Sequence, residues 1–329
     1  MLTKRSLLAD AASIALGGTI GQAFAQADFP SKAMRVMVGY AAGGGVDIVA
    51  RLVGEQMGNA FRQTVIVENR SGASAMLAAN AVAKADPDGH TLLAAAAGEV
   101  AINPYIFEKM MYDPARELAP VALIGTVPCV VVVASGTPVR NPKELIAYAK
   151  ARPGKLSFSS SGVGNPQQLA GELMNRMAGV QVLHVPYRGA APAVTDVAGG
   201  AVTMSFSSLG AALSLIQAGQ LRAVAVTSKE RMPQLPDVEP LSAGEASLAE
   251  YELLNWFGVF APAKTPPESI KKLNEVVNSA LANRALADKL MVQGIVPRTM
   301  SVDEFGAFVR TERLKFAKIA KEANIKAEN

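Results

Sequence analysis

Short apolar runs alternate with amphipathic helical patterns along most of this chain, and that alternation limits its fold more than any other feature. Repeated strand–helix–strand order predicts mostly parallel sheets in an α/β architecture. The strands are expected over residues 34–38, 64–67, 91–95, 121–125, 130–134, 156–158, 180–184, 202–206, 221–226 and 257–261. The helices between them are expected over 47–60, 74–83, 143–151, 167–178, 190–198 and 211–218. These strands are more than one compact sheet needs, and 329 residues are enough for two α/β domains.

The last third of the chain predicts helices that serve packing. Thr265-Pro266-Pro267-Glu268 and Ser301-Val302-Asp303-Glu304 both match the capping box that opens a helix. Apolar residues recur at helical spacing after each box, so we assign these two helices no chemistry. The stretch 229–250 is rich in Pro, Ser, Gly and acids, and we predict a long loop that crosses between the domains.

The N-terminus has the pattern of a secretory signal peptide. Lys4 and Arg5 precede the apolar stretch 7–20, and Ala23-Phe24-Ala25 supplies the small residues of a cleavage site. We expect residues 1–25 to be removed, with cleavage after Ala25 or after Ala27, and the mature protein to be exported. A buried N-terminal helix is the alternative. No later apolar stretch is long enough to cross a membrane.

Charge and residue content argue against several function classes. The formal net charge is +4 and no basic run carries interleaved aromatic residues, so no nucleic-acid partner is expected. The single cysteine, Cys129, cannot make an intramolecular disulfide or a thiolate metal site, and His90 and His184 lack metal-ligand spacing; we expect no metal and no cofactor. An exported serine hydrolase that uses residues 159–161 with His184 stays open, although the G-x-S-x-G elbow is absent.

A glycine-rich loop follows the first predicted strand. Val38-Gly39-Tyr40-Ala41-Ala42-Gly43-Gly44-Gly45-Val46-Asp47 lacks both the Lys-Ser/Thr end of a phosphate-binding P-loop and the spacing of a dinucleotide fold. It keeps the general property of a helix start, namely unpaired backbone N–H groups at the positive end of a helix dipole, which suits a carboxylate. Asp47 in the first turn caps the helix or, as a second possibility, touches the ligand.

Similar loops end other predicted strands, at 94–99, 159–165, 186–189 and 205–208. Ligands of α/β sheets bind outside the carboxyl ends of the strands. Small hydroxyls, backbone N–H groups and one tyrosine fit recognition of a polar molecule better than bond breaking, because no acid is paired with a base in these loops.

Over nearly all of residues 28–325, the chain resembles a known family, the periplasmic solute-binding proteins of tripartite tricarboxylate transporters, also called the Bug family. The landmarks are Phe29-Pro30-Ser31-Lys32, Gly43-Gly44-Gly45-Val46-Asp47, Val67-Glu68-Asn69-Arg70-Ser71-Gly72-Ala73, Ala83-Lys84-Ala85-Asp86-Pro87-Asp88-Gly89-His90-Thr91-Leu92-Leu93, Ala101-Ile102-Asn103-Pro104, Tyr112-Asp113-Pro114, His184-Val185-Pro186-Tyr187-Arg188-Gly189 and Pro236-Asp237-Val238. The resemblance implies a two-lobed α/β fold of the type II periplasmic binding proteins, with the ligand cleft between the lobes. Lobe one would take residues 28–125 and 250–329, and lobe two residues 126–249.

The resemblance also implies where a small carboxylic acid would bind. The expected ligand-binding residues are Tyr40, Ala42, Gly43, Gly44, Gly45, Asp47, Ala97, Gly98, Glu99, Ser160, Ser161, Gly164, Asn165, Tyr187, Ser207 and Ser208.

Some of these positions depart from the family. Many relatives open the first loop with Phe-Pro, where this chain has Tyr40-Ala41-Ala42, and often carry hydroxyls at the positions of Ala96 and Ala97 and an acid at that of Ser207. If Glu99 faces the cleft it would repel a second ligand carboxylate, so we expect a ligand with one carboxylate and a neutral, aromatic or amine-bearing tail. Glu99 directed to solvent or capping a helix is the alternative.

The function that the resemblance implies is capture without catalysis. A periplasmic, monomeric solute-binding protein would close its lobes over a small carboxylate and deliver it to the membrane permease of a tripartite tricarboxylate-type transporter. An extracytoplasmic ligand sensor for a signalling system is one alternative, and the exported serine hydrolase is another.

Overall fold

A computed structural model describes residues 29–327. The predicted signal peptide and its two cleavage sites lie outside the described residues. No helix in the described range is both long and apolar enough to cross a bilayer.

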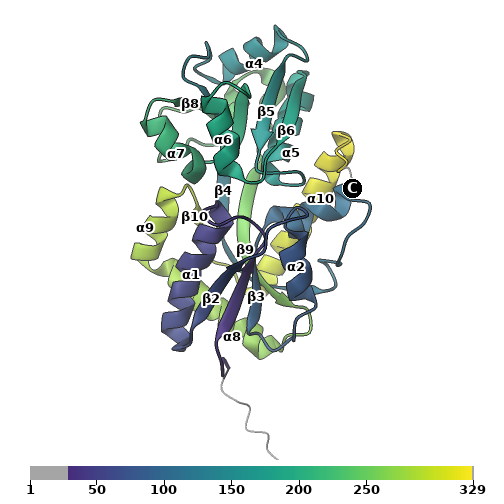
Figure 1. The fold of residues 1–329 in the computed structure, drawn as a ribbon, viewed down its shortest axis with the longest axis vertical. Helices are drawn as coiled ribbons and strands as arrows, with labels where there is room; N and C mark the ends of the chain where they lie inside the picture. The colour runs from purple at the N-terminus through teal and green to yellow at the C-terminus, as the bar shows by residue number, and fades with distance from the viewer. Residues whose placement is uncertain (1–28, 328–329) are drawn as a thin grey trace, which may run out of the picture.

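The strands form one continuous ten-stranded sheet that divides between two lobes (Figure 1). In the first lobe, β1 (Met34–Val38) pairs in parallel with β2 (Val65–Asn69) and β3 (Thr91–Ala96). In the second, β5 (Leu156–Ser160) pairs in parallel with β6 (Val182–Pro186) and β7 (Met204–Ser208). The remaining strands are β4 (Leu118–Ala134), β8 (Leu221–Val226), β9 (Leu254–Pro262) and β10 (Val296–Pro297).

Strands β4 and β9 connect the lobes and run side by side between them (Figure 1). β9 is antiparallel to β3, and β4 is antiparallel to β9 from Leu118 to Pro128. From Cys129 onward, β4 pairs instead with β7 and β8. The sequence predicted two strands here, but the structure has one. Pro128 lies where β4 changes its pairing partner, so its missing N–H does not break a continuous row of ladder hydrogen bonds.

Helices pack against the sheet in both lobes (Figure 1). The first lobe carries α1 (Gly45–Phe61), α2 (Met76–Ala83), the π-helical turn η1 (Gly98–Ile102), α3 (Asn103–Ile106), α8 (Pro267–Ala282), α9 (Arg284–Val292) and α10 (Val302–Glu322). The second lobe carries α4 (Pro142–Lys150), α5 (Pro166–Ala178), α6 (Ala190–Ala198) and α7 (Leu209–Gln217). The apolar stripe of α10 is buried, as its helical spacing predicts, with Phe305, Val309 and Phe316 in the core.

The two predicted helix starts differ in outcome. The capping box of Ser301 and Glu304 is present at the start of α10. The one at Thr265 is wrong: α8 takes Pro266 as its N-cap, without a side-chain cap bond, and the Thr265 hydroxyl is buried without a partner. Since Pro266 precedes a second proline it is held in an extended conformation, which delays the helix by one residue.

The prediction that 229–250 crosses between the domains is also wrong. This segment contains the short 3₁₀ helices η2 (Leu241–Ala243) and η3 (Ala246–Leu248) and does not run from one lobe to the other, although Gln234 donates a hydrogen bond to the Met291 carbonyl of α9 in the first lobe. Glu245 pairs with Lys150 of α4 at 2.5 Å, and Pro240 bridges to Val226 of β8. The chain returns to the first lobe only through β9, which the sequence predicted from Phe257 onward.

Candidate functional site

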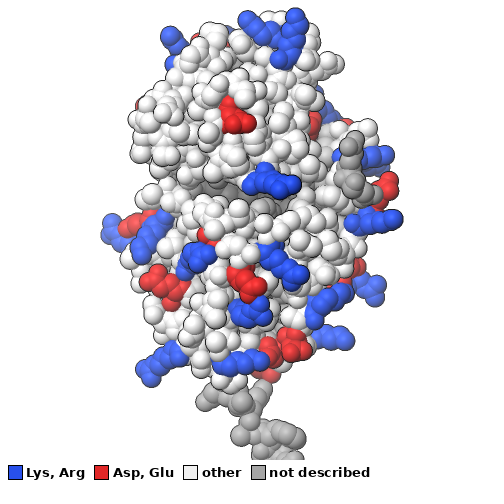
Figure 2. Space-filling model, viewed as in Figure 1, with Lys and Arg blue, Asp and Glu red and all other residues white. Residues whose placement is uncertain are grey.

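Two adjoining cavities lie between the lobes, in the hollow that crosses the face shown in Figure 2. The first has a volume of about 340 Å³ and the second about 650 Å³, both within the range of small-molecule sites. Their walls share Tyr40, Ala41, Ser161, Asn165, Arg188 and Gly189. The cavities therefore form one elongated cleft with Tyr40 at the junction.

Helix starts surround the first cavity. Gly45 and Val46 begin α1, Ala190 and Ala191 begin α6, and Gly210 and Ala211 lie in the first turn of α7; all of them line the cavity. None of these three helices has a side-chain cap bond at its N-terminus. Their first-turn N–H groups lack intrahelical partners, and three positive dipole ends meet at one place. Converging helix starts of this kind suit a small anion.

Asp47 holds the glycine loop before α1 in place through side-chain hydrogen bonds on the side away from the cleft. Asp47 accepts hydrogen bonds from the Gly43 N–H at 2.9 Å, from Asn69 Nδ2 at 2.9 Å and from Arg51 Nε at 3.1 Å. Asn69 Nδ2 also donates to the Tyr40 carbonyl at 3.1 Å. Burial opposes ionisation of Asp47, but the bonds from Arg51, Gly43 and Asn69 outweigh it and hold its pKa below the ordinary value.

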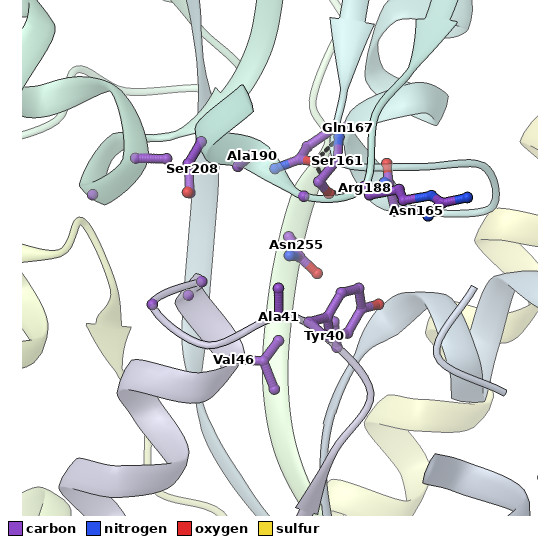
Figure 3. Close-up of a pocket in the computed structure, with 18 of the residues that line it drawn as sticks. Tyr40, Ala41, Val46, Ser161, Asn165, Gln167, Arg188, Ala190, Ser208 and Asn255 are labelled. Carbon is purple, nitrogen blue, oxygen red and sulfur yellow. Dashed lines mark hydrogen bonds between the residues drawn. The ribbon is translucent and has the colours of Figure 1, made fainter. Parts of the chain in front are cut away.

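The walls of the cleft carry little charge. Among the residues that line the two cavities, Arg188 alone bears a charged side chain, and no carboxylate faces either space. Arg188 is exposed, and within the described residues it makes no ion pair. In Figure 3 it lies beside Asn165 on the second-lobe wall, while Asn255 points into the cavity from β9. The electrostatic balance of the cleft favours an anion.

The structure brings most of the expected ligand-binding residues to the cleft. Those that line a cavity are Tyr40, Ala42, Gly43, Gly44, Gly45, Ser161, Gly164, Asn165, Tyr187 and Ser208. The others lie behind the walls: Asp47, Ala97, Gly98, Glu99, Ser160 and Ser207.

Glu99 neither faces the cleft nor points to solvent. Its side chain is fully buried in η1, where it accepts hydrogen bonds from the Tyr40 hydroxyl at 2.8 Å and the Ala96 N–H at 3.0 Å. Burial raises the pKa of Glu99 to about 7, although these bonds act in the opposite direction. The carboxylate is therefore connected to the cleft through the hydroxyl of Tyr40. It does not face a bound ligand, so the predicted repulsion of a second ligand carboxylate by Glu99 has no direct basis.

Ser160 and His184 form a contact without the features of a catalytic pair. Ser160 Oγ lies 2.7 Å from His184 Nε2, but it also lies 2.7 Å from the Gly162 carbonyl, to which it donates. His184 must then donate to the serine instead of accepting its proton. Burial lowers the pKa of His184 to about 4, and Ser160 is fully buried. This geometry supports a structural role.

Several residues that line the first cavity were not on the list of expected ligand-binding residues, although Ala41, Ala96, Arg188 and Gly189 lie in loops that the sequence singled out. The full set is Ala41, Val46, Ala96, Pro166, Gln167, Arg188, Gly189, Ala190, Ala191, Pro192, Gly210, Ala211, Asn255 and Phe257. The alanines and glycines contribute backbone groups, so their side chains gave no indication. Arg188 adjoins Tyr187 in a loop that the sequence did single out, and its charge could have identified it.

Comparison with known proteins agrees with the fold. The sequence profile of the tripartite tricarboxylate transporter family receptors (TctC) matches residues 49–325. BugT of Bordetella pertussis is 31% identical over 299 residues, which cover 91% of each chain. These matches span nearly the whole described region.

Solved structures share the same two-lobed fold. The R. palustris protein Rpa4515, solved with adipate, is 34% identical, with a TM-score of 0.87 over 91% of this chain and 99% of its own. MatC from Rhodopseudomonas palustris, solved with malate, is 29% identical, with a TM-score of 0.81 over 88% of this chain and 99% of its own. The family model describes a transporter receptor, and the periplasmic binding protein BugD shares the fold at 30% identity with a TM-score of 0.83, so the chain is a receptor and not an enzyme, which removes the hydrolase alternative. The chain therefore belongs to the tripartite tricarboxylate transporter receptor family, the Bug proteins, with the periplasmic binding-protein fold that its motifs predicted.

Proposed function

We propose that this protein captures a small carboxylic acid in the periplasm and delivers it to the membrane permease of a tripartite tricarboxylate-type transporter. One observation carries the proposal: the uncapped N-termini of α1, α6 and α7 converge on a cavity that no carboxylate lines. The adipate and malate bound by the two R. palustris proteins support the same ligand class.

The ligand carboxylate would lie against the first-turn N–H groups of α1 in one lobe and of α6 and α7 in the other. A single anion would then bridge the lobes and favour their closure. We propose that residues 28–125 with 250–329, and residues 126–249, are the units that move, because β4 changes its pairing partner just after Pro128. A micromolar Kd corresponds to about 8 kcal/mol, which several charge-assisted hydrogen bonds and apolar contacts can supply.

Matched acids and amides test this proposal. The purified protein is titrated calorimetrically with adipate, malate and benzoate and with their amides. The chain's single tryptophan, Trp256, is buried in β9 next to Asn255 and gives an independent fluorescence readout of closure. We expect at least one acid to bind with micromolar Kd and its amide to bind at least about tenfold more weakly. Equal affinity for acid and amide, or no binding of any acid, would count against it.

A further inference from the structure

Glu99 is a fully buried carboxylate that lies directly behind the wall of the cleft. Both groups that hydrogen-bond its side chain belong to residues that line the first cavity. The Tyr40 hydroxyl donates to Oε2 at 2.8 Å, and the Ala96 N–H donates to Oε1 at 3.0 Å. Tyr40 also lies at the junction of the two cavities (Figure 3). One residue therefore separates the Glu99 carboxylate from the space that a bound anion would occupy.

No cation balances the charge of Glu99 when it is ionised. Asp47, the other carboxylate behind the wall, pairs with Arg51 at 2.9 Å, whereas Glu99 takes part in no ion pair among residues 29–327. Arg313 of α10 packs against η1, but it donates to the carbonyls of Val100 and Pro114 at 2.9 Å and 2.8 Å. A carboxylate that is buried without a cation gains and loses its proton more readily near neutral pH than an exposed one.

The other titratable groups that face Glu99 are tyrosines. Of the elements packed against η1, β3 has no titratable residue and α3 carries only Tyr105. The segment after α3 adds Tyr112, whose hydroxyl donates to the Glu99 carbonyl. Burial raises the pKa of both Tyr40 and Tyr112 well above the ordinary value, so the two tyrosines that bond Glu99 stay neutral.

The part of the second lobe that approaches η1 carries no titratable side chain. It comes so close that a Cβ at Gly98 would lie 2.9 Å from the Gly164 carbonyl. Residues 161–165 are Ser, Gly, Val, Gly and Asn. Behind them, burial lowers the pKa of His184 to about 4, so this imidazole is neutral, while burial raises the pKa of Glu99 to about 7. At this place in the cleft, Glu99 is the group that can exchange a proton at neutral pH.

A bound anion acts on this carboxylate in two ways that have the same sign. Its negative charge, placed across Tyr40 from Glu99 in a site with little water, opposes a second negative charge and favours the protonated acid. While Glu99 is ionised, the Tyr40 hydroxyl directs its proton at Oε2 and offers the cleft only oxygen lone pairs. Once Glu99 is protonated it donates to the Tyr40 oxygen, and the hydroxyl proton of Tyr40 is free to turn toward the ligand.

We infer that capture of an anionic ligand is coupled to the uptake of one proton from solvent by Glu99, with Tyr40 connecting the buried carboxylate to the cleft. This rests on the proposed function and adds a regulation of the same site. An O–H bond forms at Glu99 Oε2, and no other covalent bond of protein or ligand forms or breaks. Since the bound state holds more protons than the free state, affinity decreases as pH rises through neutrality.

Affinity and proton uptake are measured in the same titrations. The protein is titrated calorimetrically with adipate, malate and benzoate from about pH 6.5 to about pH 8.5, where their carboxyl groups are ionised, in pairs of buffers with different ionisation enthalpies. We expect the Kd of the tightest-binding acid to rise at least about fivefold over this range, and about half a proton or more to be taken up per ligand near pH 7.5. A constant Kd without proton uptake would overturn the inference and leave the proposed function intact, whereas failure of every acid to bind would remove both.

Two glutamine variants assign the proton. Glu99→Gln mimics the protonated acid, because its amide can donate to the Tyr40 oxygen and accept from the Ala96 N–H. We expect its Kd at about pH 8.5 to match that of the parent at about pH 6.5, without proton uptake, and thermal melting to confirm the fold. Glu172 of α5 is the matched control, since burial also raises its pKa but it does not line the cleft. Glu172→Gln should keep the pH dependence of the parent; if Glu99→Gln keeps it too, the proton binds elsewhere and the inference fails.

Tyr40→Phe tests the connection between Glu99 and the cleft. The variant removes a hydrogen bond that favours the ionised form of Glu99, so the carboxyl group should keep its proton to higher pH. We expect the decrease in affinity to begin at a higher pH than in the parent, and the Kd at about pH 6.5 to be weaker because the donor to the ligand is lost. An unchanged pH profile would overturn the coupling through Tyr40.

Discussion

Asp47 accepts a hydrogen bond from the backbone N–H of Gly43, four residues earlier, at 2.9 Å. The first turn of α1 thereby holds the preceding loop in place. The loop lines the cleft, but the Asp47 side chain itself does not. A carboxylate that sequence analysis placed among the ligand-binding residues instead positions the backbone that would bind the ligand.

Replacing that carboxylate should loosen the loop. In Asp47→Asn one acceptor oxygen becomes a donor that faces Gly43 N, Asn69 Nδ2 or Arg51, so at least one hydrogen bond is lost. We expect ligand affinity to fall about tenfold, or roughly 1.4 kcal/mol, in calorimetric titration. Asp288→Asn makes the same change in an exposed pair with Arg284 and should leave affinity unaltered. Equal affinity of both variants and the parent protein would contradict the positioning role.

Close approach of the lobes beside Tyr40 should depend on Gly98. A Cβ at this position would lie 2.9 Å from the Gly164 carbonyl in the opposite lobe and 3.2 Å from the Tyr40 hydroxyl. Gly98→Ala should therefore oppose closure and weaken the ligand about tenfold. Gly136→Ala, where nothing lies within 4 Å, is the control. Unchanged affinity in Gly98→Ala would mean that the lobes need not meet here to bind.

Arg188 should contribute through its charge. It is the single charged residue on the cavity walls, and it is exposed, so its attraction for an anion is screened by salt. In Arg188→Gln we expect affinity to fall about threefold to tenfold at low ionic strength, and the difference from the parent to shrink at high salt. Titrations at two salt concentrations measure both effects; a loss that is independent of salt would point to packing instead of charge.

Buried Glu99 should make stability depend on pH. Its pKa is about 7 in the folded protein against 4.5 as the ordinary value, so between these pH values the folded state binds more protons than the unfolded one. The free energy of unfolding should therefore decrease as pH rises from about 5 to about 7, by roughly 2 kcal/mol from this group. Glu99→Gln, which mimics the protonated acid, should lose this slope in urea unfolding between pH 5 and pH 8. A parent protein without the slope would show that Glu99 is ionised throughout.

The sequence predicted the architecture well because the fold depends on local sequence patterns. The bounds of β1, β8 and α6 were predicted to the residue, and the glycine loop does lie at the cleft. Alternation of apolar runs with helices, and glycines at strand ends, are local properties that tertiary structure did not override.

The binding surface was harder to predict because much of it is backbone. Ala190 and Ala211 line the first cavity through helix starts, which only the three-dimensional arrangement brings together. Asn255 and Phe257 lie in β9, whose apolar run indicates core and not ligand contact. The burial of Glu99 depends on η1, a π-helical turn with no sequence pattern that predicts it.

The position of a bound carboxylate tests the account most directly. A crystal structure of the protein with the tightest-binding acid from the titrations should place both carboxylate oxygens within hydrogen-bonding distance of N–H groups in the first turns of α1 and of α6 or α7. A carboxylate held in the second cavity, or bound by side chains alone with those helix starts facing water, would contradict it.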